Sequence, residues 1–206
     1  MSLLCNIGIW YEDKNEIKFI TFNNFDEIKK FNYVEKIVKM NCAGRLLEKI
    51  PFIPPNLKHL DCSNNNLYYL PKLPDSLEIL NCRTNEIEYL SKLPDNLKLL
   101  DFSNNQVEYV NNLPESLIEL HCFNNNLTKL DVEYLKNLIL LRCFNNRINN
   151  IKLPKSIVEI SCNNNKLNKL DLISFDKLKY LNCSDNNLES LVLPNSIIEL
   201  FKNNIV

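Results

Sequence analysis

Residues 57–70 of this 206-residue chain read LKHLDCSNNNLYYL, and residues 77–90 read LEILNCRTNEIEYL. Both follow the pattern L-x-x-L-x-C-x-x-N-x-L-x-x-L, with Ile at one Leu position of the second copy. Copies recur along most of the chain in steps of 20, 20, 20, 20, 21, 19 and 21 residues. Internal repetition of this period is typical of a stacked architecture. Eight units begin at residues 37, 57, 77, 97, 117, 138, 157 and 178, and a shortened ninth begins at Ile197.

The apolar positions of the unit predict one short β-strand in every repeat. The fourth and sixth residues are apolar and flank a polar one, which is the period-two pattern of a strand. A unit of about twenty residues is too small to bury its apolar face alone, so the units must stack. We therefore expect parallel strands about 4.8 Å apart, one from each unit.

An asparagine recurs at the ninth position of the unit. After the strand the chain turns inward, and its backbone N–H and C=O groups need new partners. A carboxamide carries both donors and acceptors. The sequence therefore predicts a ladder of buried amides that joins neighbouring rungs: Asn65, Asn85, Asn105, Asn125, Asn146, Asn165 and Asn186.

Seven of the eight cysteines occupy the sixth position of a unit, and Phe102 takes that position in the fourth. No C-x-x-C pair occurs, so the spacing is wrong for a zinc site and we expect no metal. One thiol per rung makes a column rather than pairs, which predicts buried, reduced cysteines. Reduced thiols favour a cytoplasmic protein. The column comprises Cys42, Cys62, Cys82, Cys122, Cys143, Cys162 and Cys183.

Charge and composition exclude several kinds of partner. The net charge is −1, so there is no basic excess to neutralise a nucleic acid. The chain has only two glycines, which excludes a Gly-rich phosphate loop, and we expect no cofactor. No apolar run approaches the roughly 18 residues of a membrane-spanning helix. The first ten residues lack the basic region of a signal peptide, so we expect no membrane association.

The repeat resembles the leucine-rich repeat family in its short bacterial form. Leu73-Pro74-Asp75-Ser76-Leu77 is similar to the L-P-x-x-L segment of effectors secreted by enteric pathogens, as is the segment 113–117. The segment 181–188 is similar to repeats of other bacterial and large-virus proteins. The resemblance covers residues 37–201 and implies a curved solenoid with its strands on the concave side. In those effectors a ubiquitin-ligase domain follows the repeats; none follows residue 206, so that activity is not expected here.

The fold class expected is an α/β-type leucine-rich-repeat solenoid with a parallel concave sheet. Prolines between the strands favour an extended, polyproline-like or 3-10 convex side with little helix. Two segments without proline, 131–136 and 171–176, are expected to make a helical turn. We divide the chain into an N-terminal capping segment at residues 1–36, eight repeats at 37–196 and the truncated unit at 197–206. The cap is expected to contain a hairpin and a short helix that opens at Asn24-Phe25-Asp26-Glu27.

Positions three, five and seven of each unit are expected on the concave face. Most residues there are small and polar, as on a solvated surface. Units five and six differ, because aromatic rings beside an arginine have the composition of an interface hot spot. The alternative is that the two phenylalanines only stack along the ladder. The predicted partner-binding residues are His121, Phe123, Leu140, Arg142 and Phe144.

A second column at the side of the solenoid, Tyr69, Tyr89 and Tyr109, is interpreted as packing rather than recognition. The histidines, His59 and His121, lie three rungs apart and form no catalytic set with a nucleophile. An enzyme built on His121 and Arg142 is therefore the weakest hypothesis.

The function expected is a non-enzymatic protein–protein interaction scaffold that binds a protein partner on its concave face. The alternative is the substrate-recognition part of a multi-chain enzyme or secreted effector, such as a ubiquitin-ligase adaptor. In the ninth unit Lys202 replaces the cysteine, and Ile205 fills the asparagine position. Its residues either fold back over the core or pair with a second copy, and the exposed position of Phe201 favours a homodimer through this edge.

Overall fold

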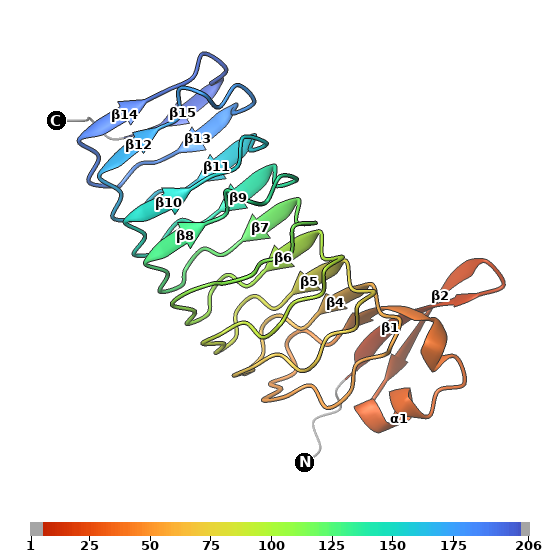
Figure 1. The fold of residues 1–206 in the computed structure, drawn as a ribbon. Coiled ribbons are helices and arrows are strands. Elements are labelled where there is room, and N and C mark those ends of the chain that lie inside the picture. The colour runs from red at the N-terminus through yellow and green to blue at the C-terminus, as the bar shows by residue number, and fades with distance from the viewer. Residues whose placement is uncertain (1–5, 203–206) are drawn as a thin grey trace.

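Parallel strands stacked rung upon rung form the body of the molecule (Figure 1). The computed structural model describes residues 6–202. Within them the largest sheet has eleven strands in the order β15-β13-β11-β9-β7-β6-β5-β4-β3-β1-β2. Each repeat unit contributes one parallel strand: β3 (Ile37–Asn41), β4 (His59–Asp61), β5 (Ile79–Asn81), β6 (Leu99–Asp101), β7 (Glu119–His121), β9 (Leu140–Arg142), β11 (Glu159–Ser161), β13 (Tyr180–Asn182) and β15 (Glu199–Phe201). The predicted solenoid with little helix is confirmed.

Register is preserved although the units differ in length. His59 lies opposite Ile79, twenty residues on, and Glu119 lies opposite Leu140, twenty-one residues on. The step back to nineteen residues keeps Leu140 opposite Glu159. Because a slip of one residue would turn every buried leucine outward, the loops absorb the extra residues and the strands do not.

Each rung is joined to its predecessor by the predicted asparagine. Asn85 donates through Nδ2 to the carbonyl of Cys62 on the preceding rung at 3.1 Å and to that of Cys82 on its own rung at 3.0 Å. Its Oδ1 accepts the Leu67 N–H at 3.0 Å. The same bonds recur at each of the other six ladder positions, so one side chain satisfies buried backbone groups of two units.

A second asparagine, one residue before the ladder, has a backbone role. In units two to eight the residue at the eighth position has φ between 53° and 55°, a left-handed conformation that Asn and Asp adopt more readily than other non-glycine residues. The turn into the core therefore selects this residue type in a chain almost free of glycine. The residues concerned are Asn64, Thr84, Asn104, Asn124, Asn145, Asn164 and Asp185.

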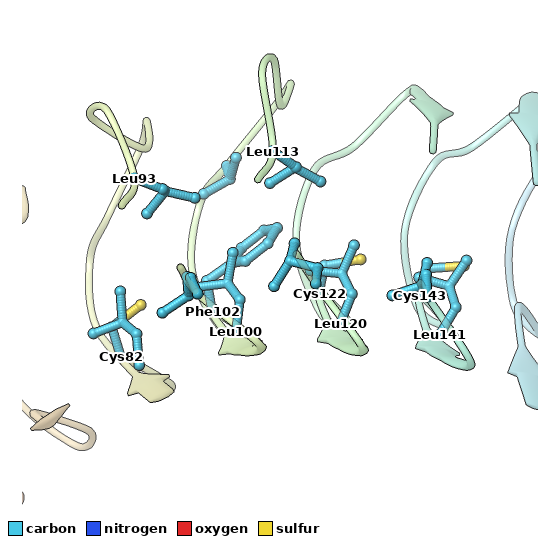
Figure 2. Packing of buried hydrophobic residues seen from close by; sticks show 14 of the residues in the cluster. Cys82, Leu93, Leu100, Phe102, Leu113, Leu120, Cys122, Leu141 and Cys143 are labelled. Atoms are coloured by element: carbon cyan, nitrogen blue, oxygen red, sulfur yellow. The ribbon is translucent and has the colours of Figure 1, made fainter. Parts of the chain in front are cut away.

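The sixth-position cysteines form a buried column behind the sheet. All seven are free thiols and buried. Figure 2 shows Cys82, Cys122 and Cys143 in line with Phe102, which replaces a thiol without leaving the column. Leu93 and Leu113 face this column from the convex side. A cysteine therefore acts here as a small apolar residue.

The convex side carries two small parallel sheets that the sequence did not predict. One pairs β8 (Lys129–Asp131) with β10 (Asn150–Lys152), and the other pairs β12 (Lys169–Asp171) with β14 (Ser190–Val192). The expected helical turns begin where β8 and β12 end. They are single turns closed by bonds such as Leu135 N–H to the Val132 carbonyl at 3.0 Å, and neither becomes a helix.

The N-terminal segment lies against the first rung. β1 (Ile7–Asp13) pairs antiparallel with β2 (Glu16–Phe22) on one side and with β3 on the other. Helix α1 (Phe25–Lys29) follows, and the 3-10 helix η1 (Val34–Lys36) leads into β3. Asn24 caps α1 through Oδ1, which accepts the Glu27 N–H at 3.0 Å. The N-terminal hairpin therefore extends the large sheet beyond the first rung, and β2 is the strand at that edge of the sheet.

We expect Asn125→Ala to lower the free energy of unfolding by at least about 2 kcal/mol, because it leaves buried backbone groups without partners. Asn125 donates to carbonyls of Phe102, Cys122 and Phe123 at 3.1 to 3.3 Å and accepts the Val107 N–H. Urea unfolding followed by circular dichroism measures the change. Asn187→Ala, at an exposed position, is the control and should shift stability by under about 0.5 kcal/mol. Equal losses in the two variants would contradict the structural role of the ladder.

Thiol labelling tests the cysteine column. Burial raises the pKa of Cys82, Cys122 and Cys143, and it raises that of Cys183 to about 11. Because the thiolate is the reactive form, a raised pKa slows alkylation. We expect the native protein to react with iodoacetamide at pH 8 far more slowly than the urea-unfolded protein, with Cys183 first among these four. Mass spectrometry of peptides measures the order; rapid native labelling of the column would contradict it.

Candidate functional site

The first and third residues of each strand point outward on the concave face of the large sheet. In β7 and β9 the middle residues, Leu120 and Leu141, are fully buried, and the residues on either side of them are partly or fully exposed. Successive side chains of a strand point to opposite faces. The face thus displays positions three and five of every unit, followed by position seven where the chain turns.

Most polar residues at position five are bonded within their own turn. Asp61 Oδ1 accepts the Ser63 N–H at 3.0 Å and the Ser63 hydroxyl at 2.7 Å, and Asp101 binds Ser103 in the same way. These are Asx turns, which hold the strand end in place. The sequence analysis gave these residues no structural role. The bond to the N–H two residues on is also made by Asn41, Asn81 and Asn182.

Units five and six depart from this arrangement. His121 and Arg142 stand where units one to four and unit eight carry Asp or Asn and unit seven carries Ser161, and Phe123 and Phe144 stand two residues on. The two rings stack with centroids 4.4 Å apart and planes inclined by 9°. The stacking that the sequence analysis gave as the alternative does occur. Both rings remain partly exposed.

A depression lies beside the stacked rings. Its volume is about 430 Å³, and it receives four of the five predicted binding residues but not His121. The sequence analysis missed Glu159, Ser161 and Tyr180, because a unit-by-unit reading separates them from the phenylalanines. The lining residues are Phe123, Leu140, Leu141, Arg142, Phe144, Glu159, Ser161 and Tyr180.

Charged side chains from neighbouring strands surround the depression. Arg142 is exposed, and its guanidinium makes no ion pair with any described residue. Leu140 lies between Glu119 and Glu159 on the neighbouring strands. Arg83 lies over the Phe123 ring of the stack, with its guanidinium carbon 5.4 Å from the centroid of that ring. The depression thus combines an apolar floor with an unpaired cation.

His121 lies at the margin of this group. Its Nε2 is 3.7 Å from Glu119 Oε2, and the register places its backbone beside that of Arg142. Burial lowers the pKa of the other histidine, His59, on β4. The two histidines are therefore in different environments, and neither lies in the depression. Among residues 6–202 no group of three His, Cys, Asp or Glu side chains is placed to hold a metal ion.

The tyrosine column is a second exposed surface. Tyr69, Tyr89 and Tyr109 are 46%, 54% and 64% exposed, and no ring stacking joins them within the described chain. A hollow of about 350 Å³ lies between the last two rings beside Glu88 and Glu108. The interpretation of this column as packing is therefore not supported, since rings that stack would cover one another.

None of the described helices is long and apolar enough to cross a membrane. No protein-family model and no curated protein matches the sequence. Solved structures do match it in architecture.

The chain is similar to YopM, a leucine-rich effector protein from Yersinia pestis, with 28% identity and a TM-score of 0.67. It is also similar to the leucine-rich repeat protein LIC12759 from Leptospira interrogans, with 26% identity and a TM-score of 0.61. These matches cover 81% and 72% of this chain but only 56% and 43% of those two proteins. The leucine-rich repeat domain of APL1B shares the fold at 18% identity, with a TM-score of 0.60 and coverage of 91% of this chain and 75% of that one.

Proposed function

Because this chain is a leucine-rich repeat protein with units of about twenty residues, we propose that it is a non-enzymatic scaffold that binds a protein partner on its concave face. The observation that carries the proposal is the Phe123–Phe144 stack beside the unpaired guanidinium of Arg142. Extended surfaces of this kind are what solenoids offer to partners. The fold in general supports protein interaction; the face and the residues are our proposal.

The chemistry of the depression favours a particular kind of contact. Aromatic residues and arginine dominate interface hot spots, because they remove large areas from water and place directed donors. A partner side chain that enters the depression covers the two rings, and a partner carboxylate meets Arg142 in bidentate geometry. His121 contributes at the rim. The acidic row of Glu119 and Glu159 then disfavours a second carboxylate next to Leu140.

The position-five side chains distinguish units five and six from units one to four and unit eight. Units one to four and unit eight use their position-five side chain to close their own turn. His121 and Arg142 make no such bond, so these side chains are available to a partner. Replacing Asp or Asn at position five removes the side-chain bond that closes the turn. The presence of His121 and Arg142 at this position therefore favours a role other than closing the turn.

The runner-up function is the recognition part of a multi-chain enzyme or secreted effector, such as a ubiquitin-ligase adaptor. YopM is an effector, and the chain spans about half its length. We place the protein in the cytoplasm, or in the cytoplasm of a host cell, because a column of seven unpaired thiols suits a reducing compartment. No nucleic acid or membrane is expected among its partners, because no basic excess is present.

We expect Phe123→Ala combined with Arg142→Ala to weaken partner binding by at least about 2 kcal/mol, or roughly 30-fold, while the far-ultraviolet circular dichroism stays unchanged. The immobilised native protein and the double variant are compared by quantitative mass spectrometry of captured proteins. Affinity for the captured partner is then measured by calorimetry.

The matched control is Tyr89→Ala combined with Tyr109→Ala, which removes two exposed rings from the lateral surface. A partner lost only from the Phe123/Arg142 variant supports the concave site. A partner lost only from the tyrosine variant places the site on the side of the solenoid. Enzymatic activity in the captured complex, absent from either component alone, favours the runner-up.

We further propose a homodimer through the edge of β15. Its strand pairs only with β13 among the described residues, and Phe201 is 46% exposed. Ile205, which the sequence analysis assigned to the asparagine position of the ninth unit, lies outside the described residues. Light scattering at micromolar concentration is expected to give twice the monomer mass for the native chain and the monomer mass for Phe201→Asp. A monomer mass for both would contradict the dimer.

A further inference from the structure

The convex side of the solenoid is interrupted between its sixth and seventh units. β8 pairs with β10, and β12 pairs with β14, but no ladder joins β10 to β12 in the described chain. Figure 1 shows β10 and β12 standing further apart than the strands within either pair. The rungs are still joined just before the break, where the Lys166 N–H donates to the Ile148 carbonyl at 2.8 Å. They also stay paired on the concave side, between β9 and β11.

Both edges of the break present free backbone groups. In a parallel ladder successive residues of a strand point their N–H and C=O to opposite neighbours. The Lys152 carbonyl accepts the Val132 N–H at 3.0 Å, so Lys152 faces β8, and Ile151 faces the break. The Leu172 N–H donates to the Val192 carbonyl at 2.8 Å, so Leu172 faces β14. Lys169 and Asp171 of β12 consequently face the break from the other side.

A cavity larger than the two hollows described above occupies this break. Its volume is about 750 Å³, within the range of sites that hold a ligand. The floor is apolar, with Leu153, Leu170, Leu172 and Phe175 almost fully buried. A hollow with an apolar floor and backbone donors and acceptors on two facing walls has the composition of a strand-binding slot.

We propose that the break between β10 and β12 binds one extended peptide segment, which enters as an additional parallel strand and joins the two small sheets into one. Two alternate residues of the segment bond the N–H and C=O of Ile151. The residue between them bonds the Lys169 carbonyl and the Asp171 N–H. These four bonds repeat the pattern by which every rung meets the next.

The charges of the slot favour an acidic residue at the start of the segment, beside Lys169, whereas the exposed Asp171 on the same strand favours an uncharged polar residue two positions on. The Lys152 ammonium is already engaged by Asp131 at 2.8 Å, whereas Lys166 and Lys169 have no acidic partner among the described residues. The first outward residue of the segment would lie between Asn150 and Lys169, where a carboxylate is favoured. The inward residue would lie between Ile151 and Leu170, over the apolar floor, and should be aliphatic. The bound segment therefore reads acidic, aliphatic, polar.

The test uses the hexapeptide acetyl-STEVTS-amide with the full chain. We expect binding at about 1 mM or below by calorimetry, and at least about tenfold weaker binding when the valine nitrogen is methylated or the glutamate is replaced by lysine. In the free protein the amides of Ile151 and Asp171 should exchange hydrogen faster than those of Val132 and Leu172. Added peptide should slow the exchange of the first two.

Two protein variants complete the design. Lys169→Glu should weaken peptide binding at least about tenfold. The concave-face variant Phe123→Ala/Arg142→Ala should bind the peptide as the native chain does, so the slot and the proposed scaffold function can fail separately. The proposal is overturned by no binding at about 5 mM, by equal binding of the methylated peptide, or by loss of binding in the concave-face variant. Slow hydrogen exchange at the amides of Ile151 and Asp171 in the free protein also overturns the proposal, because the slot is then closed or already occupied by a second copy of the chain. Light scattering distinguishes these two cases.

Discussion

The side-chain amide of one asparagine per unit holds each rung of this solenoid to the next. The chain leaves the sheet after three residues in every unit but the first, because a unit of about twenty residues has to turn back to begin the next rung. Each turn exposes backbone donors and acceptors to an apolar interior, where an unsatisfied group is costly. Asn85 and its equivalents meet that demand from both sides, by donating to carbonyls and by accepting an N–H from the preceding unit. The leucine core can be continuous only because these groups are satisfied.

The column of cysteines follows from the same geometry. The sixth residue points inward just before the asparagine, into a space that a small apolar side chain fills. Phe102 is fully buried in that column, so the interior also accepts a ring at one rung (Figure 2). The packing of the column therefore does not require a sulfur atom at every rung. The raised pKa of the buried thiols removes the thiolate that metal binding and oxidation need.

Departures from the repeat locate the surfaces whose residues do not stabilise the solenoid in the usual way. At position five, Asp and Asn close the turn of most units, and His121 and Arg142 do not. On the convex side, two units of twenty-one residues alternate with units that carry a proline after the strand, and no ladder joins β10 to β12 among the described residues. The first departure presents side chains to a partner, and the second presents backbone. They lie on different sides of the solenoid and involve different chemistry.

The sequence by itself determined the repeat, the parallel strands, the amide ladder and the buried thiols, because each depends on a residue type that recurs at a fixed position in every unit. It also singled out His121, Phe123, Leu140, Arg142 and Phe144 as one group, since a departure from a regular pattern is visible without coordinates. Of these, His121 lies outside the depression that the other four line. Only the tertiary structure decided that Glu159 and Tyr180 join that group, that the tyrosines are exposed, and that the convex strands pair in twos. Those features depend on how far apart neighbouring rungs stand and which way their side chains lean. A repeat fixes what each rung contains, whereas the spacing between particular rungs is set by the packing of the whole stack.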